Sequence, residues 1–273
     1  MDTLETLFSL SGRHIVVSGC GLLGPHIAEG LLSANAKVSL IDISEVNLKK
    51  AFSKLSEKYD DKIKIYSCDI TSEESLSKVI KKIEDDLPIY GLINTAAIDP
   101  KTDPDNTSSV AGDFLEYPLE NWKLSMDVNI TGNFLLAREV SRYLIKRGEG
   151  SIVNVSSTYG VVGPDQKLYE EGCPETPFKK PGDYPTSKAA MFGFTKYLAA
   201  YFANTKIRVN CLVPGGVFNN HSEAFVKAYS SRTLLGRMAG PEEFSGAVIY
   251  LFSNASSYVT GTSMVVDGGW TAI

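Results

Sequence analysis

Short runs of β-branched and aliphatic residues alternate with longer amphipathic segments along most of this chain, and this alternation restricts the fold more than any other feature. Compact apolar runs indicate strands, and apolar residues repeating every three or four positions indicate helices. The predicted strands are residues 14–18, 37–41, 63–68, 89–94, 151–155, 207–213 and 263–266. The predicted helices are residues 24–34, 45–58, 73–85, 119–147, 184–202 and 242–252. Strands without polar alternates are typical of parallel sheets covered on both faces. We therefore predict an α/β fold, a doubly wound parallel seven-stranded sheet with helices on both faces, formed as one domain by residues 1–273.

One segment interrupts this alternation. Residues 163–183 contain several prolines and charged residues and show neither a helical nor a strand period. Structureless connections longer than about 12–15 residues are uncommon in compact domains and are usually functional. We expect an insertion or long loop here, near the substrate pocket. Residues 99–112 are similarly irregular.

Composition and charge favour a small-molecule substrate. The net charge is -5, and no block of like charges suggests binding to nucleic acid or to a membrane surface. The amino end has no signal peptide, and no apolar run is long enough to span a membrane, so we expect a cytoplasmic protein. The four cysteines show no C-x-x-C pair, and the three histidines have no metal-like spacing. We expect free thiols, buried at Cys68 and Cys211, and no metal site.

A glycine motif follows the first predicted strand directly. Gly19, Gly21 and Gly24 form G-x-G-x-x-G between a strand and a helix, which is the context of the dinucleotide-binding fingerprint. The first glycine permits a tight turn, the second lets a pyrophosphate approach the backbone, and the third allows close helix packing. The helix N-terminus then presents free N–H groups to the phosphates. The motif predicts a Rossmann-type fold that binds a dinucleotide.

Asp42 ends the second predicted strand, where a carboxylate can accept hydrogen bonds from an adenosine ribose. The same carboxylate would repel the 2′-phosphate of NADP, and no arginine follows within the next residues to hold one. The sequence therefore favours NAD over NADP.

A Y-x-x-x-K pair, Tyr184 and Lys188, falls on one face of a predicted helix. A tyrosine with an ordinary pKa near ~10 is a poor base at neutral pH, and a nearby ammonium favours its phenolate form. With the positive nicotinamide of bound NAD added, we expect the pKa of Tyr184 to move toward the working pH, where acid-base catalysis is most efficient. Upstream lie Asn129, in a predicted helix, and Ser157, just after a predicted strand.

In this combination the chain resembles the short-chain dehydrogenase/reductase family over nearly its whole length. The resemblance implies a catalytic Asn-Ser-Tyr-Lys tetrad at Asn129, Ser157, Tyr184 and Lys188, in which Ser157 orients the substrate oxygen and Asn129 holds a water linked to Lys188. It also implies a homotetramer or homodimer. The cofactor-binding residues expected from the motifs and the resemblance are Gly19, Gly21, Leu23, Gly24, Asp42, Asp69, Ile70, Asn94, Ala96, Tyr184, Lys188, Pro214, Gly215 and Val217.

The chain departs from the usual family pattern at four places. The glycine loop is one residue shorter, Asn94-Thr95-Ala96-Ala97 replaces Asn-Asn-Ala-Gly, and Asn219 replaces a threonine. The gap between Ser157 and Tyr184 is unusually long and contains the insertion. None of these departures changes the tetrad.

The predicted activity is NAD(H)-dependent interconversion of a secondary alcohol and a ketone. Two alternatives remain: a non-catalytic nucleotide-binding protein, and a dehydratase or epimerase that uses NAD transiently. The insertion is mostly polar, which suits a sugar or sugar derivative, and parts of the chain are similar to a bacterial subgroup of flagellin-modification and nonulosonic-acid enzymes. A solvated loop or an oligomer contact would explain the insertion equally well. Expected substrate contacts are Tyr159, Tyr169, Phe218 and Asn219.

Overall fold

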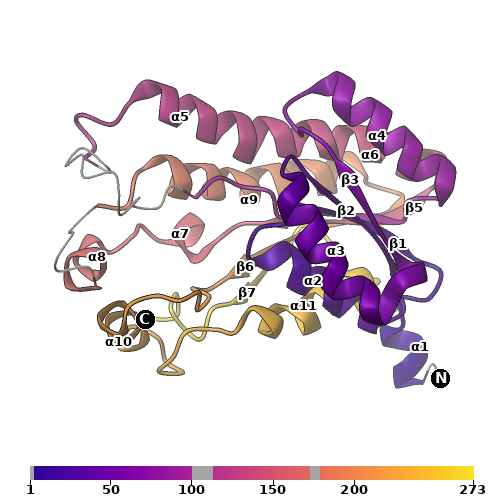
Figure 1. The fold of residues 1–273 in the computed structure, drawn as a ribbon. Helices are drawn as coiled ribbons and strands as arrows, with labels where there is room; N and C mark the ends of the chain where they lie inside the picture. The colour runs from indigo at the N-terminus through magenta and orange to yellow at the C-terminus, as the bar shows by residue number, and fades with distance from the viewer. Residues whose placement is uncertain (1–2, 100–112, 173–178) are drawn as a thin grey trace.

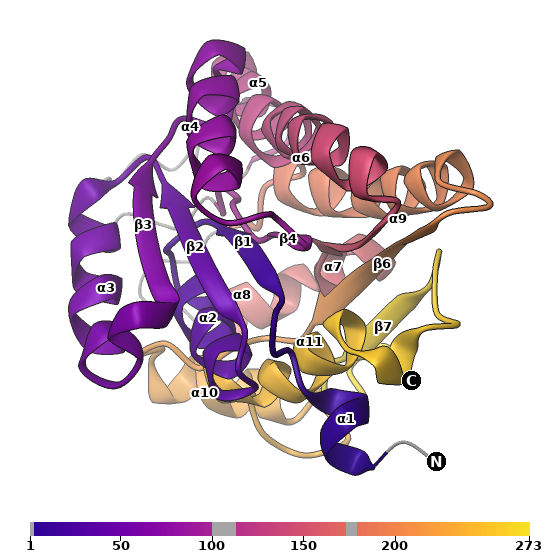
Figure 2. The same ribbon diagram turned by 90° about the vertical axis from the view of Figure 1, so that its right-hand side faces the viewer.

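A parallel sheet lies between two layers of helices (Figures 1 and 2). The computed structural model describes residues 3–99, 113–172 and 179–273. Within these ranges seven strands pair in the order β3-β2-β1-β4-β5-β6-β7. The strands are β1 (His14–Ser18), β2 (Lys37–Asp42), β3 (Ile63–Ser67), β4 (Gly91–Asn94), β5 (Glu149–Val155), β6 (Lys206–Pro214) and β7 (Ser263–Val266). This architecture confirms the predicted doubly wound sheet.

The helices begin and end at recognisable signals. Ser44 and Ser72 cap the N-termini of α3 and α4 through their hydroxyl groups, and α6 ends at Gly148, whose φ of 77° is the left-handed conformation that favours glycine. The α-helices are α1 (Leu4–Phe8), α2 (Leu23–Ser33), α3 (Glu45–Tyr59), α4 (Glu73–Asp86), α5 (Leu119–Met126), α6 (Asn133–Arg147), α7 (Thr158–Val161), α8 (Gln166–Gly172), α9 (Asp183–Tyr201), α10 (Glu223–Ser230) and α11 (Ser245–Phe252).

Each face of the sheet has its own apolar core. Ile27 and Leu31 of α2 and Val248 of α11 pack on one face together with side chains of α3. Ile80 of α4 and Val140 of α6 pack on the other face, over which α9 also lies (Figure 2). Burial on both faces explains why the strand sequences lack polar alternates.

Three predicted features differ from the structure. The helix predicted for residues 119–147 contains a π-helical turn, Asp127–Gly132, between α5 and α6. The helix predicted for residues 242–252 starts as a 3₁₀ turn, Pro241–Phe244, because proline fits the first turn of a helix. Part of the supposedly irregular 163–183 segment is the helix α8. Seven residues are too few to show a helical period, and α8 is held by its packing on α10. Residues 173–178 of that segment and most of the irregular 99–112 segment lie outside the described residues.

The order of the strands sets where a ligand can bind. The sheet runs outward in both directions from β1 and β4, which are neighbours. In open α/β sheets the crevice beyond the carboxyl ends of the strands at such a switch point is the ligand-binding position. The glycine motif follows β1, Asp42 ends β2, and Ser157 lies just beyond β5.

Candidate active site

The glycine motif forms a tight turn between β1 and α2. Gly19 has a φ of 88°, and a Cβ atom at this position would lie 2.8 Å from the Cα of Ala96. A Cβ atom on Gly24 would lie 1.8 Å from the carbonyl oxygen of Gly19. Gly21, by contrast, has no protein atom within 4 Å of its Cβ position. The protein's own packing therefore requires Gly19 and Gly24, whereas Gly21 leaves space for a group outside the protein. No side chain caps α2, so its first N–H groups suit the pyrophosphate of a dinucleotide.

The carboxylate of Asp42 is fixed by two backbone N–H groups. Oδ2 accepts from Cys20 at 2.5 Å, and Oδ1 accepts from Ser44 at 2.7 Å. Each oxygen keeps a further lone pair. Asp42 thus lies against the glycine loop and can still accept hydrogen bonds from a ribose.

The other predicted cofactor residues lie near the ends of neighbouring strands. Asp69 accepts from Thr71, Asn94 donates to Asn154 at 2.9 Å, and Gly215 packs so tightly that a Cβ atom would lie 2.7 Å from the Cα of Asp267. Ile70 and Asn94 are buried. The remaining members of this group are Leu23, Ala96, Pro214 and Val217, all at or just beyond the carboxyl ends of strands. The common location fits a dinucleotide lying along this edge.

Thr95, which replaces an asparagine of the usual family pattern, joins two strand ends. Its hydroxyl donates to the carbonyl oxygen of Ser18, and its N–H donates to the Ser18 hydroxyl at 3.2 Å. The substitution therefore keeps β4 tied to β1 beside the glycine loop.

The tetrad predicted from the sequence comes together around the start of α9. Lys188 Nζ donates to the carbonyl oxygen of Val155 at 3.0 Å and lies 5.7 Å from the ring centroid of Tyr184. A hydrogen bond joins the hydroxyl groups of Ser157 and Tyr184. The side chain of Asn129 donates to the Ile98 carbonyl at 3.0 Å and to the Ser187 hydroxyl at 3.0 Å. The fold thus brings Asn129 and Ser157 to the start of α9, which carries Tyr184 and Lys188.

The electrostatic environment of the tetrad is unusual. Burial lowers the pKa of Lys188 to about 8, while the carboxylate of Asp99 acts in the opposite direction. Burial raises the pKa of Tyr184, Asp99 raises it further, and the hydrogen bond from Ser157 lowers it. In the protein without cofactor, the phenol of Tyr184 is therefore neutral at physiological pH, and any shift toward the working pH needs added positive charge.

A buried carboxylate anchors the first turn of α9, directly before Tyr184. Asp183 is 0% exposed and accepts hydrogen bonds from the hydroxyl groups of Tyr117, at 2.9 Å, and of Ser125. It also accepts from the N–H of Tyr184 at 2.8 Å. Asp183 therefore ties α9 to α5 and to the segment that precedes α5. No pattern in the sequence indicates this role.

Replacing this carboxylate should destabilise the protein. Asp183→Ala leaves the hydroxyl groups of the half-buried Tyr117 and the buried Ser125 without their acceptor, and we expect the free energy of unfolding to fall by about 3 kcal/mol. Urea denaturation followed by circular dichroism measures the change. Asp86→Ala, which removes an exposed carboxylate paired with Lys64, is the control and should have little effect. Equal stability of the two variants would contradict the anchoring role.

The helix α8, within the insertion, packs against α10. Leu168 and Tyr169 are buried in a cluster with Tyr229, Met238 and Trp270. The Tyr169 hydroxyl donates to the Tyr159 hydroxyl at 2.9 Å. Arg232 forms ion pairs with Asp165 at 2.9 Å and with Glu171 at 3.1 Å, which clamps both ends of α8.

The four predicted substrate contacts divide into two pairs. Tyr159 and Tyr169 touch each other in the cluster just described. Phe218 and Asn219 lie on the exposed stretch after β6, where the N–H of Phe218 donates to Ala239 at 2.9 Å. Ring contacts link the two pairs: Tyr169 packs on Phe225, Phe225 stacks on His221 with centroids 4.8 Å apart, and His221 contacts Phe218.

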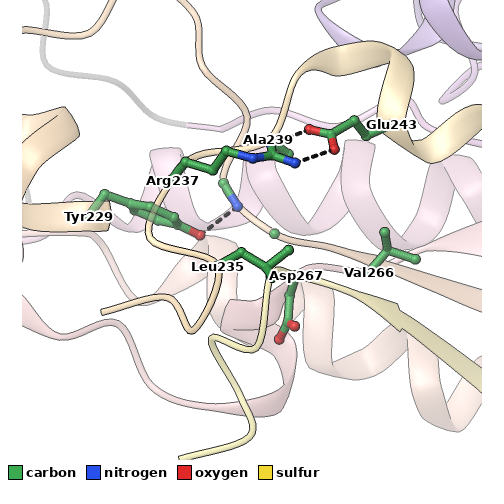
Figure 3. Close-up of a pocket in the computed structure, with 10 residues that line it drawn as sticks. Tyr229, Leu235, Arg237, Ala239, Glu243, Val266 and Asp267 are labelled. Carbon is green, nitrogen blue, oxygen red and sulfur yellow. Dashed lines mark hydrogen bonds and ion pairs between the residues drawn. The ribbon is translucent and has the colours of Figure 1, made fainter. Parts of the chain in front are cut away.

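A cavity of about 70 Å³ lies behind the loop that follows β6 (Figure 3). Its lining includes Gly215, whereas no member of the tetrad contributes to it. The Tyr229 hydroxyl accepts from the N–H of Gly216 at 2.6 Å, and Arg237 pairs with Glu243 at 2.6 Å. These interactions fix the loop that presents Pro214 and Gly215 to the cofactor edge.

Comparison with known proteins identifies the family. The family model described as short chain dehydrogenase matches residues 13–170, and the model described as enoyl-(acyl carrier protein) reductase matches residues 174–271. The chain therefore belongs to the short-chain dehydrogenase/reductase family. It is an NAD(P)-dependent oxidoreductase that acts on CH–OH groups.

Among curated relatives, a 2,5-dichloro-2,5-cyclohexadiene-1,4-diol dehydrogenase of Sphingobium indicum is 32% identical, over 97% of this chain and 99% of the relative. A galactitol 2-dehydrogenase of Cereibacter sphaeroides is 30% identical, over 98% of each chain. The post-translational flagellin modification protein A of Campylobacter coli is 29% identical, over 96% of this chain and 99% of the relative.

Solved structures share the fold over the whole chain. A short-chain dehydrogenase of Leptospira borgpetersenii with bound NAD⁺ has a TM-score of 0.82 and 31% identity, covering 99% of this chain and 96% of that one. A gluconate 5-dehydrogenase of Burkholderia cenocepacia, in complex with NADP and tartrate, has a TM-score of 0.82 and 26% identity, covering 99% and 100%. Both dinucleotides thus occur among the structural neighbours.

Three further findings concern the described residues alone. No helix in them is long and apolar enough to cross a membrane. They contain no group of three or more His, Cys, Asp or Glu side chains that could hold a metal ion. Cys20, Cys68 and Cys211 are free and buried.

Proposed function

We propose that this protein interconverts a secondary alcohol and a ketone on a polyhydroxylated small molecule, with NAD(H) as the cofactor. The observation that carries the proposal is the grouping of Ser157, which is hydrogen-bonded to Tyr184, with Lys188 Nζ 5.7 Å from the Tyr184 ring, at the same sheet edge as the glycine loop. The names of relatives that act on a diol and on galactitol support a substrate with several hydroxyl groups.

Bound NAD supplies the hydride acceptor for alcohol oxidation. In this proposal the N–H groups beside Gly21 bind its pyrophosphate, and Asp42 binds the adenosine ribose. The open space at Gly21 and the remaining lone pairs of Asp42 are the features of this structure that fit the dinucleotide.

Side chains of the protein accept the proton that the substrate hydroxyl group loses. The Ser157 hydroxyl binds the substrate oxygen and orients it toward Tyr184, whose phenolate oxygen takes the hydroxyl proton as the C–H bond breaks. Lys188 in its protonated form lowers the free energy of the phenolate. The side chain of Asn129 forms hydrogen bonds with the backbone of Ile98, after β4, and with the hydroxyl group of Ser187, on α9. It therefore fixes α9 against the segment that follows β4.

A turnover panel tests the function. Galactitol and cyclohexanediols are offered with NAD, and keto-sugars, sugar nucleotides, aliphatic ketones and acyl thioesters with NADH. We expect NADH to form from the polyols and to be consumed by the corresponding ketones. Turnover restricted to acyl thioesters or to unsubstituted aliphatic ketones would contradict the proposed substrate class.

The preference for NAD is also a proposal, and it rests on Asp42. A 2′-phosphate brought next to this fixed carboxylate costs roughly 1–3 kcal/mol, which corresponds to a preference of about 5- to 150-fold. We expect Asp42→Ala to reduce the ratio of NADP to NAD dissociation constants by a comparable factor, as measured by fluorescence titration. Asp86→Ala should leave this ratio unchanged. Equal affinities for the two cofactors in the unmodified protein would remove Asp42 from the proposed role.

A further inference from the structure

An ion pair between a buried lysine and a partly exposed carboxylate lies beside Tyr184. Lys180 Nζ pairs with the carboxylate of Asp99 and lies 4.7 Å from the ring centroid of Tyr184. The side chain of Lys180 is 7% exposed, whereas that of Asp99 is 39% exposed. Lys180 belongs to the insertion and Asp99 to the segment after β4, so the pair is formed only in the folded protein.

Both partners are held through their neighbouring backbone. The Gln166 amide donates to the carbonyl oxygen of Lys180 at 3.2 Å and accepts from its N–H at 2.8 Å. On the other side, Asn129 donates to the carbonyl oxygen of Ile98, next to Asp99, at 3.0 Å and accepts from its N–H at 2.7 Å. Two unrelated parts of the fold therefore fix the pair in place.

The charge of Asp99 acts on the reactive side chains. Its carboxylate raises the pKa of Tyr184, of Lys188 and of Tyr159. Only Oδ1 is engaged, by Lys180, and within the described residues Oδ2 accepts no hydrogen bond. A half-exposed carboxylate near the catalytic phenol can accept hydrogen bonds from hydroxyl groups and repels anions.

We propose that Asp99, held by Lys180, determines substrate specificity by accepting a hydrogen bond from a second hydroxyl group of the substrate. The substrate class is then a neutral diol or polyol, in preference to a monoalcohol or a sugar acid. This inference rests on the proposed function, because it concerns the substrate of the same site. Lys180 is a positioning residue, since it acts through Asp99.

The experiment compares kcat/KM with NAD for cyclohexanol, the cyclohexanediols, galactitol and gluconate. The variants are Asp99→Asn, Lys180→Met and the double variant that carries both changes. The double variant removes both charges together, so it leaves no unpaired buried lysine to unfold the protein. Asp86→Asn is the matched control, because Asp86 is also a half-exposed, lysine-paired carboxylate but lies on α4, away from the tetrad.

We expect the unmodified protein to favour a diol over cyclohexanol by at least about 10-fold, because a hydrogen bond to a charged group is worth about that much or more. Asp99→Asn and the double variant should lose most of this ratio. Removing the Asp99 charge also changes the pKa of Tyr184, which affects both alcohols alike, so the readout is the ratio and not the value for cyclohexanol alone. In the same variants the kcat/KM for gluconate should rise relative to that for galactitol, because the repelling charge is gone. Lys180→Met should reduce the ratio less than Asp99→Asn, and Asp86→Asn should not change it.

A diol-to-cyclohexanol ratio that is unchanged by Asp99→Asn would overturn the inference, as would a preference of the unmodified protein for gluconate over galactitol. Calorimetric titration of galactitol into the protein saturated with NADH gives the answer without turnover. Weaker binding in Asp99→Asn supports the role of Asp99, and equal or absent binding in both proteins contradicts it. Failure of the proposed function is distinguishable, because it shows as no NADH formation from any alcohol, cyclohexanol included.

Discussion

Tyr184→Phe is expected to lower kcat by about 10²- to 10⁴-fold, the usual contribution of acid-base catalysis, and to leave the affinity for NAD unchanged. The phenyl ring can keep its place beside Lys180 and Lys188, while the oxygen that takes the substrate proton is lost. Steady-state rates of NADH formation with a polyol substrate measure the first effect, and fluorescence titration with NAD measures the second.

Tyr201→Phe is the matched control for this experiment. Tyr201 is the last residue of α9 and is 62% exposed, so its hydroxyl faces solvent at the other end of the helix that carries Tyr184. We expect kcat to stay within about 2-fold of the unmodified protein. A Tyr184→Phe variant that retained near-normal turnover would rule out this tyrosine as the proton acceptor.

Lys188→Met should lower turnover and weaken NAD binding together, because the variant loses the charge that stabilises the phenolate. In the proposed family-like arrangement this lysine also contacts the nicotinamide ribose. We expect kcat to fall by about 10²-fold or more. A loss of turnover with normal NAD affinity would restrict Lys188 to the proton-transfer step.

The same change should stabilise the protein without cofactor at neutral pH. Burial lowers the pKa of Lys188 from 10.5 to about 8, so the folded state binds its proton less tightly than the unfolded state does. Burying the protonated ammonium lowers the free energy of unfolding. This loss is fully present below about pH 8 and disappears as the pH rises toward 10.5. We expect Lys188→Met to be more stable at pH 7 by roughly 2 kcal/mol, and this difference to shrink between pH 8 and pH 10.5. Urea denaturation at several pH values measures the free energies of unfolding. If the difference between the two proteins did not change with pH, Lys188 would not be a buried charged lysine.

Much of the fold could be predicted because its signals are local. The buried strand β1 begins and ends at the predicted residues, since parallel strands covered on both faces leave continuous apolar runs in the sequence. The edge strand β7 also begins and ends where predicted. The turn at Gly19 was predictable for a similar reason, because a positive φ and a close backbone approach need glycine.

The features that sequence reasoning missed depend on contacts between distant segments. The helix α8 is short and is held by α10 and by the ion pairs of Arg232, none of which leaves a periodic pattern. Asp99 and Lys180 lie in two segments without regular period, and only the fold places them beside Tyr184. The role of Asp183 as a buried anchor could not be predicted either, because its partners Tyr117 and Ser125 precede it in the sequence by more than fifty residues.

The direct test of the proposed activity is the stoichiometry between NADH and ketone formed from one polyol. Galactitol is incubated with the protein and NAD, the NADH absorbance band is followed, and the ketose product is quantified in the same samples. We predict one NADH for each ketose formed, with neither product in the Tyr184→Phe variant. Conversion of the polyol without net NADH would indicate a dehydratase or epimerase that uses NAD transiently. NAD binding without conversion of any alcohol or ketone would indicate a nucleotide-binding protein, and either result would contradict the proposed oxidoreductase.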